Sequence, residues 1–257
     1  MAVIKLFNIS EFKAWLNNQK VTRSIKLIQL HHTYSPSYKH FDGSNHLKLQ
    51  ENMRNYHVKT NGWNDIGQHF TIFPDGMIAT GRQLSKTPAG IYGANTGAIC
   101  IECLGNFDND GDVMAHSQKD AIVAIVKMLV DKFGLNAFDD VVYHAWYSSD
   151  GRALGDYYKG SSVKTCPGTN FFGGNTLTAY RNNLLPLVES YGKEEKKMNE
   201  NIVYNSIEST PDWARPTITK LIERGYLNGD TEGNLNLSMD MLRILVINDR
   251  AGIYDKE

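Results

Sequence analysis

The chain has 257 residues, with 27 Lys and Arg against 28 Asp and Glu, which gives a formal charge of −1. This balance gives no sign of a surface that binds nucleic acid, and no apolar stretch is long enough to span a membrane. Three cysteines, an odd number, argue against a disulfide framework. The length suffices for one full hydrophobic core and a small second unit.

Apolar periodicity predicts strands that alternate with helices in the larger, first part of the chain. In chain order, we expect a strand at 25–32, a helix at 44–59, strands at 68–73 and 77–80, a strand at 98–104, a helix from 117 to about 134, a strand at 141–144 and a helix at 176–190. Pro74-Asp75-Gly76 marks a hairpin turn, Ser117 resembles the start of a capping box, and Pro186 is expected to bend or end the last helix. This order predicts an α/β domain with a central mixed β-sheet flanked by helices.

The remainder of the chain has a different character. A charged run that begins at Lys193 has no apolar stripe, which is typical of a linker. Two amphipathic helices are expected beyond it, at about 211–225 and 238–250. The chain is therefore divided into a first domain at 1–192, a linker at 193–200 and a small all-α domain at 201–257. A unit as small as the last gains stability from a partner surface.

Candidate metal ligands occur where predicted strands end. Two strands end in a histidine, at His31 and His144, and Cys166 follows in a Pro-Gly loop. Imidazole and thiolate are ligands that zinc favours, and a hydrolytic zinc site needs three of them and one open position. The pattern alone leaves packing or surface histidines as an alternative. Cys100 and Cys103 lie three apart on one strand and point to opposite faces, so a shared metal or disulfide is not expected there.

A set of motifs surrounds these residues in a fixed order. They are Leu30-His31-His32-Thr33, the segment Gly62-Trp63-Asn64-Asp65-Ile66-Gly67-Gln68-His69-Phe70, Pro74-Asp75-Gly76 with Gly81-Arg82, Ile99-Cys100-Ile101-Glu102 with Leu104-Gly105-Asn106-Phe107, and Lys164-Thr165-Cys166-Pro167-Gly168. Together they resemble the type 2 N-acetylmuramoyl-L-alanine amidases, a superfamily that includes phage endolysins and peptidoglycan recognition proteins. The resemblance covers about residues 20–190. It implies zinc-dependent hydrolysis of the amide bond between N-acetylmuramic acid and L-alanine in bacterial peptidoglycan.

The resemblance places Zn²⁺ on His31, His144 and Cys166. It selects His31 over His32 because the family's ligand is the first residue of this pair. Some relatives carry Asp as the third ligand. A thiolate donates more charge to zinc, so the bound water should be slightly less acidic here. Cys166 is then a ligand and not a nucleophile; a lone loop cysteine is the alternative.

The resemblance also implies catalytic residues. Many relatives carry Tyr at the position of Gln68, and a glutamine cannot take up a proton, so the base is expected at Glu102 instead. Lys164 matches the lysine that stabilises the oxyanion. The alternatives are a salt-bridged structural Glu102 and a surface Lys164. His57 and His69 match structural positions of the family.

Four further residues are expected to contact substrate: Arg82, Asn106, Tyr34 and Trp146. For the aromatic pair, ordinary packing is the alternative. The segment Ser148–Ser162 lies between the second and third ligands and is rich in Gly, Ser and Tyr. We interpret it as an inserted loop over the cleft that sets substrate choice.

The tail carries a second resemblance. Thr210-Pro211-Asp212-Trp213-Ala214, the segment 221–229, and Leu237-Ser238 with Met241 and Arg243 resemble a single S-layer-homology repeat. Such repeats bind cell-wall polymers and commonly pack in threes. The resemblance implies attachment to the wall and a homo-oligomer formed through this domain. A helical hairpin that docks on the first domain is the alternative.

A hypothesis concerns the start of this tail. Codons for Lys193, Glu194 and Glu195 can form a purine-rich ribosome-binding sequence upstream of Met198. Internal initiation there would yield a short product that holds only the tail domain and supplies extra copies to the oligomer. An ordinary charged linker explains the same residues.

These features together imply an endolysin or autolysin that causes lysis, of bacteriophage or prophage origin. Its expected partners are peptidoglycan and a cell-wall polymer, with no nucleic acid and no membrane insertion. Residues 1–6 are too short and too soon polar for a signal peptide, so we expect synthesis in the host cytoplasm and action at the wall after release. Two alternatives stay open: a peptidoglycan-binding protein without activity, and a cytoplasmic amidase that recycles muropeptides.

Overall fold

The computed structural model describes residues 3–192 and 203–255. These form two compact units that divide after Tyr191, and each is described by itself. The predicted linker at 193–200 and Met198 lie outside the described residues. No helix in the described ranges combines the length and the apolar character that crossing a membrane requires.

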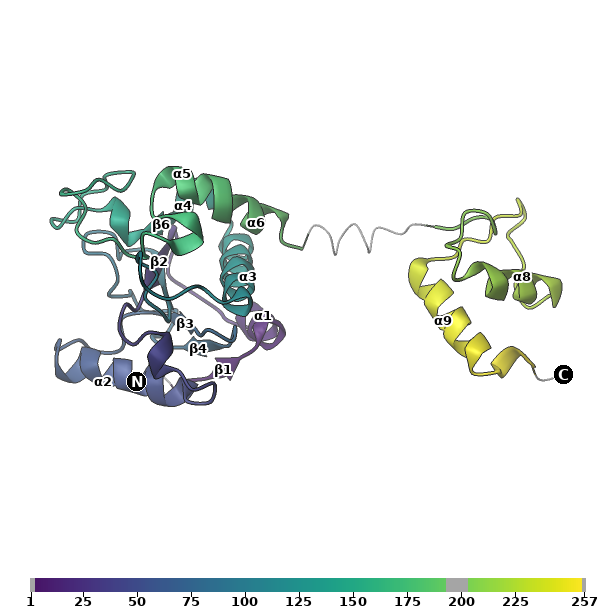
Figure 1. Ribbon diagram of the computed structural model, residues 1–257, viewed down its shortest axis with the longest axis horizontal. Helices are drawn as coiled ribbons and strands as arrows, with labels where there is room; N and C mark the ends of the chain where they lie inside the picture. Colours follow the sequence, from purple (N-terminus) through teal and green to yellow (C-terminus); the bar gives the residue numbers. More distant parts are fainter. Residues whose placement is uncertain (1–2, 193–202, 256–257) are drawn as a thin grey trace. The chain divides into compact units, whose positions relative to one another are not determined.

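A six-stranded mixed sheet forms the centre of the described part of the first unit, in the order β1-β4-β3-β5-β2-β6 (Figure 1). The strands are β1 Leu6–Phe7, β2 Leu27–His32, β3 Phe70–Ile72, β4 Ile78–Thr80, β5 Ala98–Cys103 and β6 Val141–Tyr143. β5 pairs in parallel with β2 and β3, and β2 pairs in parallel with β6. β4 is antiparallel to β1 and β3. The predicted mixed sheet is therefore confirmed.

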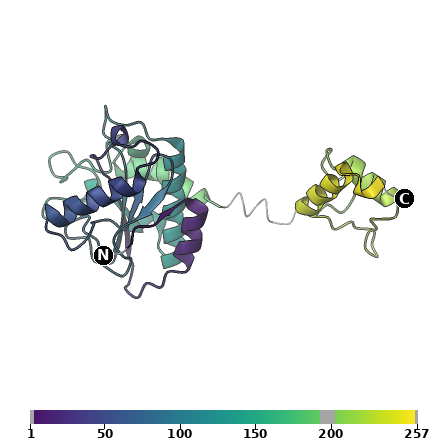
Figure 2. The same ribbon diagram turned by 90° about the horizontal axis from the view of Figure 1, so that it is seen from below.

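Helices cover both faces of this sheet. They are α1 Ile9–Asn17, α2 His46–Lys59, α3 His116–Phe133, α4 Ala137–Asp140, α5 Leu177–Ala179 and α6 Leu185–Ser190. Figure 2 shows α2 on one side of the sheet and α1 and α3 on the other. Ile78 and Ala79, neighbours on β4, belong to the two different cores because successive strand residues point to opposite faces. Burial of apolar side chains on both faces of the sheet therefore positions the helices.

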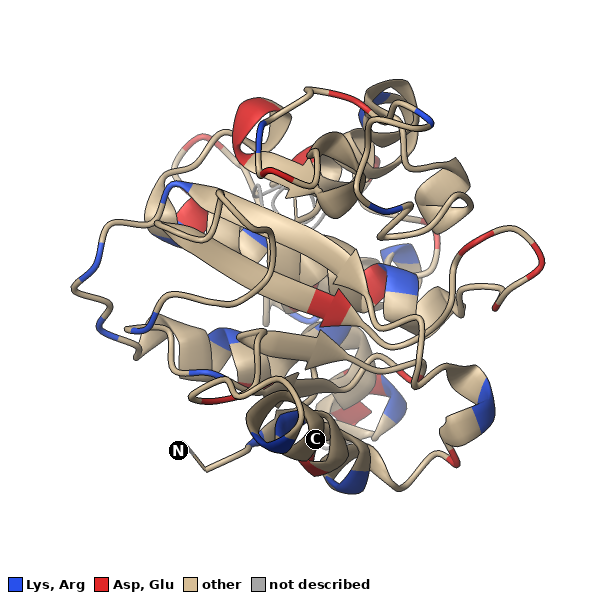
Figure 3. Ribbon diagram, turned by 90° about the vertical axis from the view of Figure 1, so that its left-hand side faces the viewer, with Lys and Arg blue, Asp and Glu red and all other residues tan. Residues whose placement is uncertain are grey.

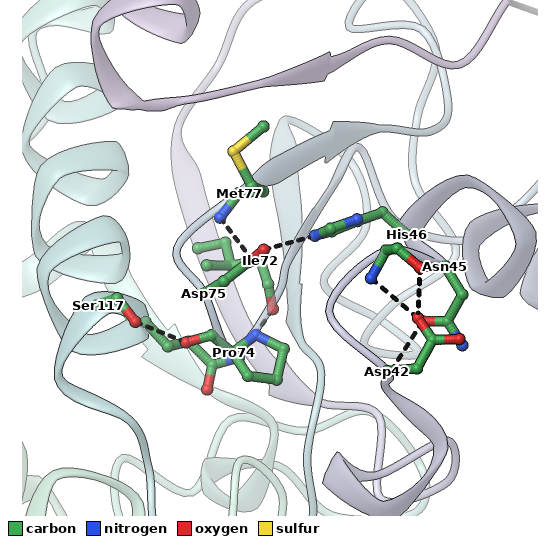
Figure 4. A network of polar contacts seen from close by, with 10 residues as sticks. Asp42, Asn45, His46, Ile72, Pro74, Asp75, Met77 and Ser117 are labelled. Atoms are coloured by element: carbon green, nitrogen blue, oxygen red, sulfur yellow. Dashed lines mark hydrogen bonds and ion pairs between the residues drawn. The ribbon is translucent and has the colours of Figure 1, made fainter.

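Some local predictions were wrong or incomplete. The sequence pattern does not predict β1 or α1. The capping box at Ser117 is absent: α3 begins at His116 after Ala115, and Ser117 Oγ instead donates to Pro74 O at 2.7 Å (Figure 4). A contact with a distant turn thus replaces the local cap. Pro186 does not end the last helix, because a five-residue π-helical segment, Tyr180–Leu184, precedes it and accommodates the missing N–H.

The β3–β4 turn anchors the start of α2. His46 Nε2 lies 2.7 Å from Asp75 Oδ2, and Met77 N donates to Asp75 Oδ1 at 3.1 Å (Figure 4). The His46 ring also packs between Phe41 and Phe73, with ring centres 4.8 Å away in both cases. These contacts fix α2 against the sheet. Residues that follow His46 on α2 line a cavity.

The second unit has two α-helices among its described residues, α8 Arg215–Glu223 and α9 Met239–Arg250, at the positions expected from periodicity, and a 3-10 turn, Ile253–Asp255. Its own small core is formed by Tyr204, Ala214, Ile218, Leu237, Leu242 and Val246. Ser238 caps α9 by accepting a hydrogen bond from Met241 N. A single β-bridge joins Tyr204 and Leu237.

Acid should destabilise the first unit through His69. This imidazole is fully buried, Nδ1 accepts from Cys100 N at 3.0 Å, and Nε2 donates to Lys86 O at 2.9 Å. Burial lowers the pKa of His69 to about 3. The unfolded imidazole takes up a proton near pH 6.5, so the stability present above that pH is lost as pH falls towards 3. We expect a loss of about 3 kcal/mol at about pH 4.5.

Urea unfolding at a series of pH values, with chelator present, measures this loss. The variant His69→Gln has no group that titrates at this position, so its free energy of unfolding should fall less steeply between about pH 6.5 and about pH 4.5. Equal slopes for the two proteins would show that His69 is not responsible.

Candidate metal centre and active site

Three side chains from separate parts of the first unit converge. His31 lies on β2, His144 begins a short 3-10 turn directly after β6, and Cys166 lies in a loop. All three are buried, and their ligand atoms lie within 4.8 Å of one another. The two Nδ1 atoms of His31 and His144 are 3.2 Å apart, and Cys166 Sγ is 3.6 Å from His31 Nδ1.

These distances fit a tetrahedral zinc ion. Zinc bonds of about 2.0 Å to nitrogen and about 2.3 Å to sulfur place two nitrogens about 3.3 Å apart, and nitrogen and sulfur about 3.6 Å apart. Three such donors leave the fourth position to water or substrate. Cys100 and Cys103 are buried free thiols outside the group. The donor set and its spacing therefore suit zinc.

The Cys166 loop is tied to its neighbours by backbone contacts. Ala145 N donates to Cys166 O at 2.7 Å, which joins the loop to the residue after His144. His32 lies outside the metal group, and its Nδ1 accepts from Phe107 N at 3.1 Å. His31 thus belongs to the group of possible metal ligands, whereas His32 contacts the backbone of the loop after β5.

Glu102 lies beside the metal group. It is the direct neighbour of His31 across the parallel β2–β5 pair, and its buried Oε2 atom has no hydrogen-bond partner in the described part of the chain. Burial raises the pKa of Glu102 to about 8, while the positive charge of Lys164 acts in the opposite direction. Lys164 itself is solvent-exposed and lines the same cavity. A carboxyl group whose pKa lies close to neutral pH can both take up and release a proton, as general acid–base catalysis requires.

Burial also sets the charge of the ligands. It lowers the pKa of His31, with smaller contributions from His144 and Lys164, and it lowers the pKa of His144 to about 4. Both imidazoles are therefore neutral at pH 7, as metal ligands must be. Burial, and then Glu102, raise the pKa of the Cys166 thiol. Formation of the thiolate therefore needs a nearby cation, which a bound metal supplies.

A cavity of about 1030 Å³ opens over this group. Its other wall comes from α2, through Asn52, Met53 and Tyr56, and from Trp63. Tyr34, Tyr56 and Trp63 are exposed at its edge. The cavity is therefore lined by the metal-binding group and by exposed aromatic side chains that form its rim.

The residues predicted to contact substrate occupy different places. Tyr34 lines the cavity, whereas Arg82, Asn106 and Trp146 are not among the described residues that do so. The Arg82 guanidinium donates to three backbone oxygens, those of Asp65, Ile66 and Thr87. Trp146 is buried and donates from Nε1 to Asn175 O at 2.8 Å. These side chains hold the segments behind the cavity wall.

The inserted segment Ser148–Ser162 contributes none of the described lining residues. It contacts the loop that contains Tyr92 and Gly93. A Cβ at Gly151 would lie 2.7 Å from Tyr92 O, and a Cβ at Gly93 would lie 2.6 Å from Gly151 O, so a glycine is needed on each side. The backbones therefore touch directly. The predicted loop over the cleft therefore packs against residues 92–93 and does not supply any of the described residues that line the cavity.

Sequence reasoning missed the α2 wall and Asp108. The polar and aromatic residues of α2 occur at helical spacing, but only the tertiary fold shows which face meets the cavity.

Gln68 is buried and lines the cavity. Its Nε2 donates to Thr71 Oγ1 at 3.0 Å, and its Oε1 has no hydrogen-bond partner among the described residues. It thus supplies a neutral polar group to the cavity wall.

Figure 3 shows Lys and Arg interspersed with Asp and Glu along the described ribbon, on the side that it draws.

Gly90 closes the wall behind His31. A Cβ there would lie 2.3 Å from Gln29 Oε1, 2.9 Å from Cys100 Sγ and 3.2 Å from His31 Nε2. We expect Gly90→Ala to push the His31 ring and to lower zinc affinity by about 10-fold or more. Competition with a chromophoric chelator measures the affinity, and thermal unfolding of the metal-free variant tests whether it is folded. Wild-type zinc affinity in a folded Gly90→Ala variant would show that Gly90 does not position His31.

The family match to known proteins falls within the first unit. The family model described as N-acetylmuramoyl-L-alanine amidase matches residues 21–169, more than half of the chain. The human N-acetylmuramoyl-L-alanine amidase is 33% identical over 89 residues, which are 32% of this chain and 16% of that protein. The endolysin of Klebsiella phage KP32 is 29% identical over 79 residues, 31% of this chain and 52% of the relative. The match thus spans about half or less of these two relatives.

Two solved structures are also similar. Peptidoglycan recognition protein LB of Drosophila is 22% identical, with a TM-score of 0.48 over 63% of this chain and 83% of that one. The N-acetylmuramoyl-L-alanine amidase LysC from Clostridium intestinale is 26% identical, with a TM-score of 0.42 over 58% and 80% of the two chains. On the strength of the family match over residues 21–169, the chain belongs to the N-acetylmuramoyl-L-alanine amidase family.

Proposed function

We propose that the chain hydrolyses the amide bond between N-acetylmuramic acid and L-alanine in bacterial peptidoglycan, with Zn²⁺ held by His31, His144 and Cys166. The observation that carries this proposal is the convergence of these three ligands beside Glu102, at one end of a large cavity. Membership of the amidase family supports the reaction type. The biological role we propose is that of an endolysin, which lyses bacteria by acting on the wall after release.

The residues of the site have distinct tasks. When bound, zinc would polarise the lactyl carbonyl and lower the pKa of water. Glu102 takes a proton from the attacking water and returns it to the nitrogen of the leaving L-alanine. Lys164 stabilises the negative charge that develops on the carbonyl oxygen. The aromatic rim at Tyr34 and Trp63 offers apolar surface to the sugar or the stem peptide.

Two substitutions separate metal binding from proton transfer. Glu102→Gln should lower kcat by about 100-fold or more with zinc content unchanged, because only the proton acceptor is lost. Cys166→Ser should lose zinc and activity together, because a hydroxyl is a much weaker ligand than a thiolate. Zinc is measured by elemental analysis. Activity on purified sacculi is measured as new amino-terminal L-alanine.

The control for this experiment is the absence of new reducing sugar ends, since a glycosidase would produce them. Chelator should abolish activity and added zinc should restore it. Binding to sacculi without release of L-alanine would favour the alternative of a recognition protein. Cleavage of soluble muropeptides but not of sacculi would favour a recycling enzyme. Undiminished zinc in Cys166→Ser would contradict the ligand assignment.

For the second unit, we propose attachment to a cell-wall polymer and self-association through α9. Its resemblance to a single S-layer-homology repeat supports the first part. For the second, α9 exposes Met241, Ile244 and Ile247, while Leu242 and Val246 fill the core. This exposed apolar stripe, centred on Ile244, is the surface through which copies of the unit would associate. A short product that starts at Met198 would supply further copies of this unit.

Ile244→Asp in the full chain should abolish this self-association, because a carboxylate in the centre of an apolar contact is not solvated. Sedimentation equilibrium should show a lower mass than for the wild type. Ile253→Asp is the matched control, since Ile253 is similarly exposed but lies outside α9. Equal masses for both variants and the wild type would rule out the α9 contact.

A further inference from the structure

Asp108 lies in the loop that follows β5 and uses both carboxylate oxygens to hold the loop of Cys166. Its Oδ2 accepts from Thr165 Oγ1 at 3.0 Å, and its Oδ1 accepts from Thr169 N at 3.0 Å. Thr165 immediately precedes Cys166, and Thr169 follows three positions later. One carboxylate thus bridges the two ends of the metal-binding loop.

The two loops are in direct backbone contact. Asn170 N donates to Phe107 O at 2.8 Å, and Asn109 N donates to Thr169 Oγ1 at 2.8 Å. A Cβ at Gly168 would lie 2.4 Å from the backbone of Phe107, so no side chain fits between the loops. The Asp108 loop and the Cys166 loop are therefore one packed unit.

Other contacts hold the Cys166 loop from different sides. Asn175 Nδ2 donates to Thr165 O at 2.8 Å, and Ala145 N donates to Cys166 O. Both of these are neutral hydrogen bonds. Each of them reaches one point of the loop, whereas the single Asp108 side chain reaches both Thr165 and Thr169. Cys166 lies in no helix or strand, so these side contacts decide where its sulfur lies.

We propose that Asp108 is a positioning residue of the metal centre: by bridging Thr165 and Thr169 it holds Cys166 Sγ at the distance from His31 that a tetrahedral ion requires. This inference rests on the metal-binding part of the proposed function. Asp108 contacts none of the three ligand side chains through a hydrogen bond described here, and it acts through the loop.

The charge and the bridging of Asp108 have opposite effects on the metal. The carboxylate adds a negative charge near the sulfur ligand, and like charges repel, so the charge alone disfavours a thiolate at Cys166. Asp108→Asn removes the charge but preserves the bridge, because its amide oxygen can accept from Thr169 N while its NH₂ donates to Thr165 Oγ1. Asp108→Ala removes both.

The experiment measures the metal affinity of the full chain for zinc, by chelator competition, and the spectrum of the cobalt(II) form. The intensity of the thiolate-to-cobalt charge-transfer band reports the bond to Cys166. Asp108→Ala should weaken zinc binding about 10- to 100-fold and reduce this band. Asp108→Asn should stay within about 3-fold of the wild type, and Thr165→Val, which loses one of the two bonds, should fall between them.

Asp110→Ala is the matched control, because Asp110 is exposed in the same loop and makes none of the described hydrogen bonds to the Cys166 loop. Its zinc affinity and cobalt spectrum should equal those of the wild type. A merely structural role for Asp108 would lower the unfolding temperature of the metal-free Ala variant without changing the cobalt band.

Equal zinc affinity for Asp108→Ala and Asp110→Ala would overturn the inference while the metal centre stands. An Asp108→Asn variant as weak as Asp108→Ala would also overturn it, since charge and not bridging would then be decisive. Failure of the wild type to bind zinc at all would refute the proposed metal centre, and this inference with it.

Discussion

The parallel pairing of β2 with β5 and β6 is the constraint on which the site depends. Its register sets His31 directly beside Glu102 and brings the end of β6, with His144, to the same edge. A slip of one residue would turn His31 to the other face of the sheet and bring His32 in its place. Ile28 and Leu30, which precede His31 on β2, fix this register because they are fully buried.

This arrangement is unfavourable for the protein without a ligand. Two neutral imidazoles, a thiol and a carboxyl group are packed together, and both Glu102 Oε2 and His31 Nε2 lack hydrogen-bond partners. Unpaired buried polar atoms cost free energy, so the rest of the first unit must supply the stability that keeps them in place. The large apolar core on one side of the sheet and the smaller one on the other serve this purpose.

The sequence indicated the central elements well because their signals are local. Buried strands such as β2 and β5 and the apolar stripe of α3 carry their own periodicity. The expectation failed where a distant partner decides: Ser117 bonds to a turn instead of capping α3. The candidate ligands were predicted from ordered motifs. The role of Asp108 was not, because it depends on a contact between loops far apart in sequence.

The choice of a thiolate as third ligand has a consequence for the chemical lifetime of the protein. A cysteine sulfur can be oxidised to sulfenic acid and beyond, which would remove one of the metal donors, whereas a carboxylate has no such reaction. Oxidation requires access of the oxidant to the sulfur, and Cys166 is only 5% exposed. The packed loops that hold Cys166 in place therefore also shield it, so geometry and redox protection come from the same contacts.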